Sequence, residues 1–146
     1  MGTTPIRLGD PLHEEAIVYR AFALHGYRQR KPPKVRPFAY YRDESHIDGL
    51  SLGETPESAV AGLEINYGYC SIRVGDIRAL RQGLDVRPDL DNPGHLILCN
   101  VPILTGSDEE RGRAAQIAGQ LARISKPICF DHYPPSQAED LLPSIP

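Results

Sequence analysis

The chain has 146 residues, enough for one domain with its own core, and its 40% hydrophobic and 24% charged content excludes wholesale disorder. A net charge of −3 excludes a surface that attracts nucleic acid as a whole. The N-terminal segment lacks the apolar stretch of a signal peptide, and no window is long enough to span a membrane. We therefore expect a cytoplasmic protein, with Cys70, Cys99 and Cys129 as buried thiols in a reducing compartment.

The chain divides into three parts by composition. Residues 1–13 form an N-terminal arm, residues 14–133 a single domain, and residues 134–146 a C-terminal tail rich in proline and leucine. Short apolar runs alternate with two strong helix patterns in the central part. The sequence therefore predicts an α+β fold, with a mostly antiparallel or mixed, split β-sheet and two main helices.

The first strand is predicted over residues 16–22, where apolar side chains fall on both faces except at Arg20. An arginine that emerges from a buried strand points toward a partner. We expect that partner to be either a bound ligand or a carboxylate of the chain, for which Asp85 and Asp48 are the candidates.

A long, irregular connection follows at residues 23–47, with three prolines and a basic stretch at 28–42. Loops of this length without regular structure are usually functional or disordered. Within it, Tyr40 and Tyr41 are candidates for a short strand.

The clearest local pattern is the stretch 48–63, in which a short strand turns at Gly53 into a helix. Ser51 is the polar residue of that strand, and Thr55 is a good N-cap followed by proline at the first helical position. The helix is expected to continue to about Asn66.

The remaining elements are strands over residues 69–74, 84–86, 95–99 and 127–131, and a helical turn over 75–80. The second main helix is predicted from the Ser107 cap to Ile124, with alanines on a buried stripe.

The order of these elements carries a resemblance. A strand with an emerging arginine (VYRAF), a basic loop, a strand with a small polar residue (GLSL) and a helix opened by ETPESAVAGLE are similar to the first half of the ADP-ribosyltransferase superfold. Within it, residues 16–64 look most like the bacterial RES-domain toxins that consume NAD. The Gly-Arg-Trp/Phe-Asn segment typical of RES domains is absent, and strands 95–99 and 127–131 hold no glutamate, which transferases normally carry on a late strand. The chain also resembles small bacterial proteins with the patterns YRAF, DGLS, TPE, VGDIR and LDV.

The resemblance implies NAD as a substrate, bound or cleaved at its nicotinamide–ribose bond. Such a site needs a cation for the pyrophosphate, a hydroxyl for the ribose, an aromatic face for nicotinamide, and a carboxylate for the oxocarbenium-like transition state. In that order, the residues are Arg20, Ser51, Tyr40 or Tyr41, and Glu64, with His46 as a donor or base. Each has a structural alternative: an ion pair for Arg20, turn chemistry for Ser51, and a solvated position for Glu64 and His46.

Other functions have their own signals. His95 and Cys99 face the same side of one strand, but two residues do not make a metal site, and no metal is predicted. A protein-interaction module that uses the basic loop 28–42 or the tail 134–146 is the main alternative. Aromatic residues interleaved with basic ones in that loop suggest single-stranded RNA as a third possibility. Because no nucleic-acid-binding motif accompanies them, nucleic acid is not the expected partner.

Overall fold

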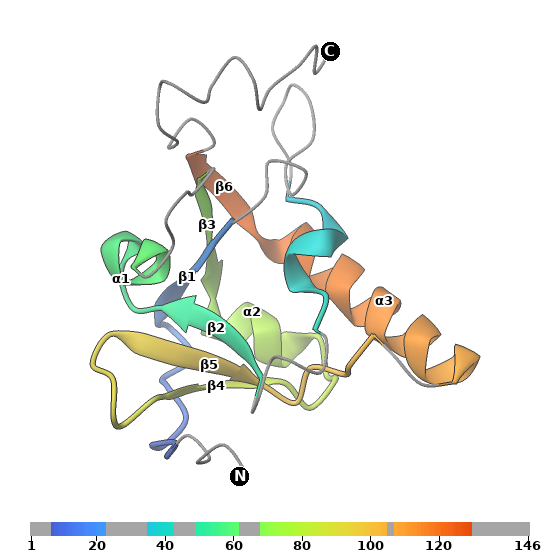
Figure 1. Cartoon of the computed structure of the whole chain (residues 1–146), viewed down its shortest axis with the longest axis horizontal. Helices are drawn as coiled ribbons and strands as arrows, with labels where there is room; N and C mark the ends of the chain where they lie inside the picture. The colour runs from blue at the N-terminus through green and yellow to red at the C-terminus, as the bar shows by residue number, and fades with distance from the viewer. Residues whose placement is uncertain (1–6, 23–34, 43–48, 62–67, 105–106, 130–146) are drawn as a thin grey trace, which may run out of the picture.

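The computed structural model describes residues 7–22, 35–42, 49–61, 68–104 and 107–129. These residues build a six-stranded sheet in the order β4-β5-β2-β1-β3-β6, and every neighbouring pair is antiparallel (Figure 1). Together with the helices, this confirms the α+β fold with a mostly antiparallel sheet. The strands are β1 (Ile17–Ala21), β2 (Leu50–Gly53), β3 (Tyr69–Arg73), β4 (Asp85–Pro88), β5 (His95–Cys99) and β6 (Lys126–Cys129).

Helices lie on both sides of this sheet, as Figure 1 shows. The helices are η2, a 3₁₀ helix (Pro37–Tyr40), α1 (Pro56–Val60), α2 (Val74–Ala79) and α3 (Asp108–Ile124). Helix α1 contacts β1, β2 and β3, whereas α3 packs against η2 and α2. In the described part of the chain, no helix combines the length and apolar character needed to cross a membrane.

Helix α3 confirms the prediction for the second main helix. The Ser107 hydroxyl accepts a hydrogen bond from the Glu110 N–H, and the Glu110 carboxylate accepts one from the Ser107 N–H. This capping box pairs donors that the first turn would leave without partners. The buried stripe is Ala114, Ile117, Ala118, Leu121 and Ala122. Its small residues let the helix approach its neighbours closely.

Helix α1 begins as predicted and ends early. Thr55 caps it and Pro56 occupies the first turn, but the helix stops at Val60, and Ala61 already has an extended ψ of 135°. The prediction of a helix to Asn66 is therefore wrong at this point, and residues 62–67 lie outside the described part of the chain. None of the helical residues is buried. Without an apolar face to pack, a short helix has little to extend it.

One face of the sheet carries the core. Alternation places Val18 of β1, Phe22 directly after β1, and Leu50 and Leu52 of β2 on this face, all almost fully buried. Arg20 lies between Val18 and Phe22 in the same alternation, so it too belongs to the core face. Only one face of β1 is buried, because Ile17 on the other is 46% exposed. The prediction that both faces are buried is wrong for this strand.

The other face, called here the outer face, carries the polar residues of β2, β4 and β5. Helix α1 covers part of it at Gly53, where an added Cβ would lie 2.3 Å from the backbone nitrogen of Ala59. Such a short distance requires glycine. The chain therefore crosses from β2 to α1 with almost no space between them.

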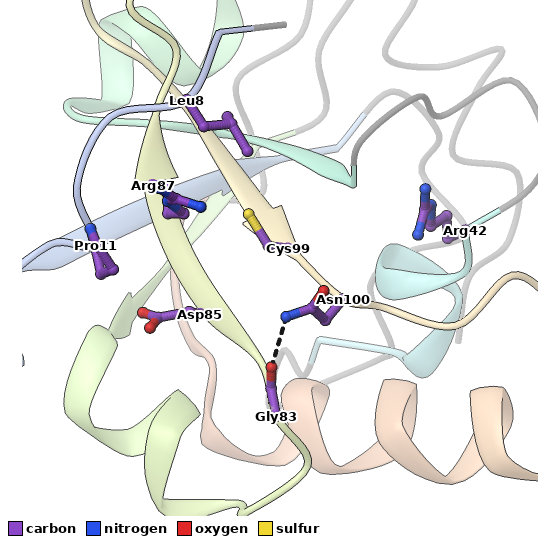
Figure 2. Close-up of a pocket in the computed structure, with 8 residues that line it drawn as sticks. All are labelled: Leu8, Pro11, Arg42, Gly83, Asp85, Arg87, Cys99 and Asn100. Atoms are coloured by element: carbon purple, nitrogen blue, oxygen red, sulfur yellow. Dashed lines mark hydrogen bonds between the residues drawn. The ribbon is translucent and has the colours of Figure 1, made fainter. Parts of the chain in front are cut away.

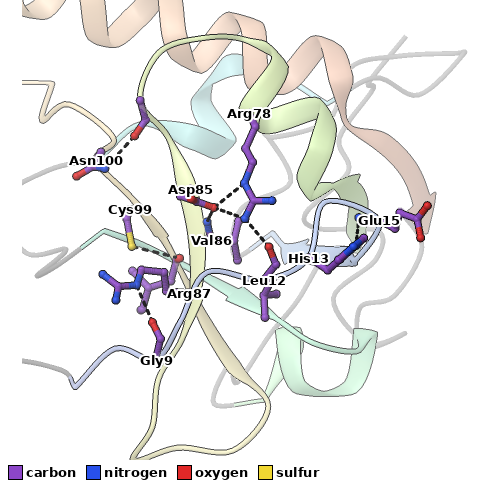
Figure 3. Close-up of polar contacts among 12 residues, drawn as sticks. Gly9, Leu12, His13, Glu15, Arg78, Asp85, Val86, Arg87, Cys99 and Asn100 are labelled. Atoms are coloured by element: carbon purple, nitrogen blue, oxygen red, sulfur yellow. Dashed lines mark hydrogen bonds and ion pairs between the residues drawn. The ribbon is translucent and has the colours of Figure 1, made fainter.

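The N-terminal arm runs along the free edge of β4. The N–H groups of Gly9 and Leu12 donate to the carbonyl oxygens of Pro88 and Val86, at 2.9 and 3.0 Å. Figure 3 shows the arm beside the strand, with Arg78 bridging from α2 to the Leu12 carbonyl. The arm thus pairs backbone groups that an open sheet edge would leave unpaired.

Candidate functional site

The Ser51 side chain projects from β2 on the outer face, where it meets a histidine of the next strand. The distance from Ser51 Oγ to His95 Nε2 is 2.6 Å. In the β2–β5 register Ser51 lies opposite Ile97, so His95, two residues before Ile97, is the diagonal neighbour on the same face. Ser51 is exposed. An accessible hydroxyl is therefore hydrogen bonded to an imidazole nitrogen.

The other imidazole nitrogen meets a carboxylate. His95 Nδ1 lies 2.9 Å from Asp89 Oδ2, and Asp89 directly follows β4, the strand on the far side of β5. The second carboxylate oxygen accepts the N–H of Asp91 at 3.0 Å. Asp89 is only 9% exposed. The carboxylate is thus buried and held at both oxygens.

A tight loop between β4 and β5 fixes the two residues relative to each other. The Asp89 N–H donates to the His95 carbonyl oxygen at 3.0 Å, and the His95 N–H donates to the Asn92 carbonyl at the same distance. Gly94 supplies the positive φ of 87° that the loop needs before His95. Its carbonyl accepts the Glu54 N–H at 2.9 Å, which ties the loop to the end of β2. All three side chains therefore stand on backbone that is internally hydrogen bonded.

The three residues have the arrangement of a nucleophile, a base and an orienting group. A carboxylate that accepts from Nδ1–H leaves the Nε2 lone pair free to accept the serine proton. Both hydrogen bonds fall within the distances over which proton transfer between such groups occurs. Chemically, the arrangement is suited to activating the Ser51 hydroxyl for attack on an electrophile.

The predicted site residue Arg20 does not share this face. Its Nε donates to the Ala39 carbonyl at 3.0 Å and its Nη1 to the Ser51 carbonyl at 2.7 Å. Among the described residues no carboxylate is hydrogen bonded to it, and Asp85 instead pairs with Arg78 at 2.7 Å. The alternative pairing of Arg20 with Asp85 is therefore wrong. Arg20 and the Ser51 hydroxyl project from opposite faces of the sheet.

The aromatic candidates lie in and beside η2. Tyr40 is 1% exposed, and its hydroxyl lies 2.7 Å from Ser125 Oγ and 3.3 Å from Cys70 Sγ. It belongs to a 3₁₀ helix, which replaces the short strand suggested by the sequence, and its ring presents no open face to a ligand. Burial raises the pKa of Tyr40 well above its ordinary value and also raises that of Cys70. Tyr41 is partly buried against the core.

Several predicted features fall outside the described residues. Glu64, His46 and Asp48 do so, as do the tail 134–146 and residues 28–34 of the basic loop. Cys70 and Cys99 are buried, as expected. In the ranges that the structure describes, no three His, Cys, Asp or Glu side chains gather to hold a metal ion.

Comparison with known proteins adds no relative. No protein-family model, curated protein or solved structure matches this chain. The candidate site therefore stands on its geometry.

Sequence reasoning found Ser51 but not its two partners. Asp89 and His95 flank the turn-forming segment LDNPG, and a tight turn brings the residues on either side of it together. That pair was accessible from the sequence. The contact between Ser51 and His95 could not be predicted, because nothing in the sequence indicates that β2 lies next to β5.

Proposed function

We propose that the protein is a serine-dependent hydrolase or acyltransferase, with Ser51 as nucleophile, His95 as general base and Asp89 as the orienting carboxylate. The observation that supports this is the unbroken hydrogen-bond path from an exposed hydroxyl through an imidazole to a buried carboxylate. The substrate class is a carboxylic ester or thioester, whose carbonyl carbon a serine alkoxide attacks readily.

In the proposed reaction, Ser51 Oγ attacks the carbonyl carbon while His95 Nε2 accepts the hydroxyl proton. The tetrahedral intermediate collapses, and the imidazolium returns that proton to the leaving alcohol or thiol. Water or an acceptor alcohol then attacks the acyl-serine, with His95 again as the base, and Ser51 regains its proton. The Asp89 carboxylate stabilises the imidazolium throughout and holds the tautomer that leaves Nε2 unprotonated.

Burial increases from Ser51 through His95 to Asp89, as this chemistry requires. Ser51 is exposed, the His95 side chain is 23% exposed, and Asp89 is 9% exposed. A substrate therefore reaches the hydroxyl, while the carboxylate lies away from water, where its interaction with a protonated imidazole is stronger.

A covalent probe tests the proposal directly. Full-length protein is incubated with a fluorophosphonate, which phosphonylates activated serines, and the modified residue is located by mass spectrometry. We expect a single adduct at Ser51 that is absent in Ser51→Ala and strongly slowed in His95→Gln. Ser71→Ala is the matched control, since this serine lies on the next strand but one and is not part of the path. Absence of an adduct in the wild-type protein, or an unchanged rate in His95→Gln, would overturn the proposal.

NAD cleavage, which the sequence resemblance implies, makes a different demand. It requires Arg20 and the Ser51 hydroxyl in one cleft, and their positions on opposite faces do not support that requirement. The two hypotheses separate experimentally. Release of nicotinamide from NAD that persists in His95→Gln would favour NAD cleavage, whereas its absence together with a Ser51 adduct would favour acyl transfer.

A further inference from the structure

A pocket of ≈ 490 Å³ lies between the N-terminal arm and the strands β4 and β5. Figure 2 shows side chains from all three segments around it. Its lining includes Pro11 of the arm, Asp85 and Arg87 of β4, and Cys99 of β5. Neither Ser51, His95 nor Asp89 lines the pocket.

The acidic residue of the pocket is neutralised by a neighbour. Asp85 Oδ1 accepts hydrogen bonds from Arg78 Nη2 at 2.7 Å, from Arg78 Nε at 3.0 Å and from the Val86 N–H at 2.8 Å (Figure 3). An ion pair with this many donors balances the charge of the carboxylate. Asp85 therefore does not cancel the charge of the other polar residues.

Arg87 gives the pocket a cation that is held in place by one hydrogen bond and keeps donors for a ligand. Its Nε donates to the Gly9 carbonyl at 2.6 Å, which fixes the guanidinium at the edge of the sheet. Within the described ranges its two terminal nitrogens have no protein acceptor, and Figure 2 shows the group directed toward Cys99. A guanidinium with a free pair of N–H groups matches the two oxygens of a carboxylate or phosphate.

The register of the sheet places this cation in line with the candidate nucleophile. Arg87 lies opposite Ile97, and Ile97 lies opposite Ser51, so the three residues form one row across β4, β5 and β2 on the outer face. Neighbouring strands are about 4.8 Å apart, which separates the Cα atoms of Arg87 and Ser51 by roughly 10 Å. A linear molecule of about eight carbon atoms spans such a distance.

From these contacts we infer that the pocket binds the carboxylate or phosphate at the far end of a substrate whose acyl group is presented to Ser51. Arg87 recognises the anionic end of the substrate. The inference rests on the proposed function only for the other end, where the acyl group reacts with Ser51. The protein is thereby assigned a preference for anionic esters over neutral ones of equal length.

Binding is measured first without chemistry, in Ser51→Ala protein, by calorimetric titration. Monomethyl suberate and heptyl phosphate are the two anionic probes, and dimethyl suberate is the neutral one. We expect one or both anionic probes to bind more tightly than the neutral one, by about tenfold or more, because charged hydrogen bonds contribute more than neutral ones. The difference between the two anionic probes identifies the preferred group.

Two further substitutions test the residues, each made in the Ser51→Ala background. Arg87→Gln removes the cation, and Pro11→Glu adds an opposing charge while leaving every hydrogen bond of Arg87 in place. Both are expected to weaken anionic binding by about tenfold or more. Arg113→Gln on the exposed side of α3 removes the same charge elsewhere and should change nothing.

The outcomes separate this inference from the proposed function. Arg87-dependent binding without a fluorophosphonate adduct at Ser51 would support the anion pocket and reject the acyl-transfer proposal. An adduct at Ser51 together with equal affinity for neutral and anionic probes would support the acyl-transfer proposal and reject the anion pocket. Failure of both anionic probes to bind, or unchanged binding in both Arg87→Gln and Pro11→Glu, would overturn the pocket assignment.

Discussion

The Arg20 guanidinium donates a hydrogen bond to the backbone oxygen of Ser51, with 2.7 Å between Nη1 and O, while the Ser51 hydroxyl points to the opposite face of the sheet. Within the described residues, strands β1 and β2 pair at Tyr19 and Gly53 alone. Arg20, the next residue of β1, adds its bond to the Ser51 carbonyl and reaches the Ala39 carbonyl of η2 with a second one. The arginine that stands out in the sequence thus connects the backbones of two segments far apart in the chain.

This connection predicts a stability effect. Arg20→Met leaves the part-buried carbonyl of Ala39 and the exposed carbonyl of Ser51 without their charged donor and should lower the free energy of unfolding by about 1–3 kcal/mol. Urea denaturation measures the loss. Arg73→Met on the neighbouring β3 is the control, because its ion pair with Asp76 joins side chains that are 41% and 47% exposed and contributes little. Equal losses in the two variants would contradict the role assigned to Arg20.

Two glycines should respond in opposite directions to the same substitution. Gly53→Ala places a Cβ 2.3 Å from the Ala59 nitrogen, so α1 must move, and a loss of about 2 kcal/mol or more is expected, as for other overpacked sites. Gly112→Ala in α3 meets no atom within 4 Å and should stabilise by about 1 kcal/mol through helix propensity. Thermal unfolding of both variants checks the pair. A neutral Gly53→Ala would mean that α1 does not pack on β2 as closely as described.

Alkaline pH should destabilise the fold through two buried acids. Burial raises the pKa of Cys70 above its ordinary 9.0 and that of Tyr40 well above its ordinary 10.0. Above pH 9 the unfolded chain loses these protons before the folded one does, so the free energy of unfolding falls as pH rises, first through Cys70 and then through Tyr40.

The measurement is urea denaturation between pH 8 and pH 11 of wild-type and Tyr40→Phe protein. The variant loses the hydrogen bonds to Cys70 and Ser125 but keeps the ring, and the Ser125 hydroxyl still donates to the Leu121 carbonyl at 2.7 Å. Its stability should therefore be lower at neutral pH and decline less steeply above pH 10. The same slope in both proteins would show that Tyr40 does not remain protonated in the fold.

Local sequence patterns predicted most helices and strands well. The candidate site could be predicted only in part, because it depends on which strands pair. Caps and apolar periodicity placed α3 and the start of α1, because those signals lie within a few residues of each other. Alternation also contained the information that Arg20 shares a face with Val18 and Phe22, but its charge led to the expectation that it emerges toward a ligand or a carboxylate. The placement of β2 between β1 and β5 depends on packing across the whole sheet. Hence the sequence pointed to Ser51 through its local setting, while His95 was considered only as a metal ligand and set aside.

The hydrogen-bond path from Ser51 through His95 to Asp89 makes its most specific prediction at Asp89. Asparagine has nearly the same shape but no charge, and its amide can donate to Nδ1, which would favour the imidazole tautomer that carries its proton on Nε2. That tautomer cannot accept a proton from Ser51, and in a comparable serine site this substitution costs roughly four orders of magnitude in turnover. The fluorophosphonate reaction of Asp89→Asn should therefore slow by a large factor, with Ser51 still the labelled residue.

Asp91→Asn is the matched control for Asp89→Asn. Asp91 lies two residues along the same loop, where its exposed carboxylate pairs with Arg7 and where that arginine lowers its pKa. Its side chain does not touch His95, so labelling should proceed at the wild-type rate. Thermal unfolding of both variants separates a loss of structure from a loss of proton transfer. If a folded Asp89→Asn protein reacts as fast as Asp91→Asn, Asp89 does not orient the base, and the Ser51–His95 contact is only a cross-strand hydrogen bond.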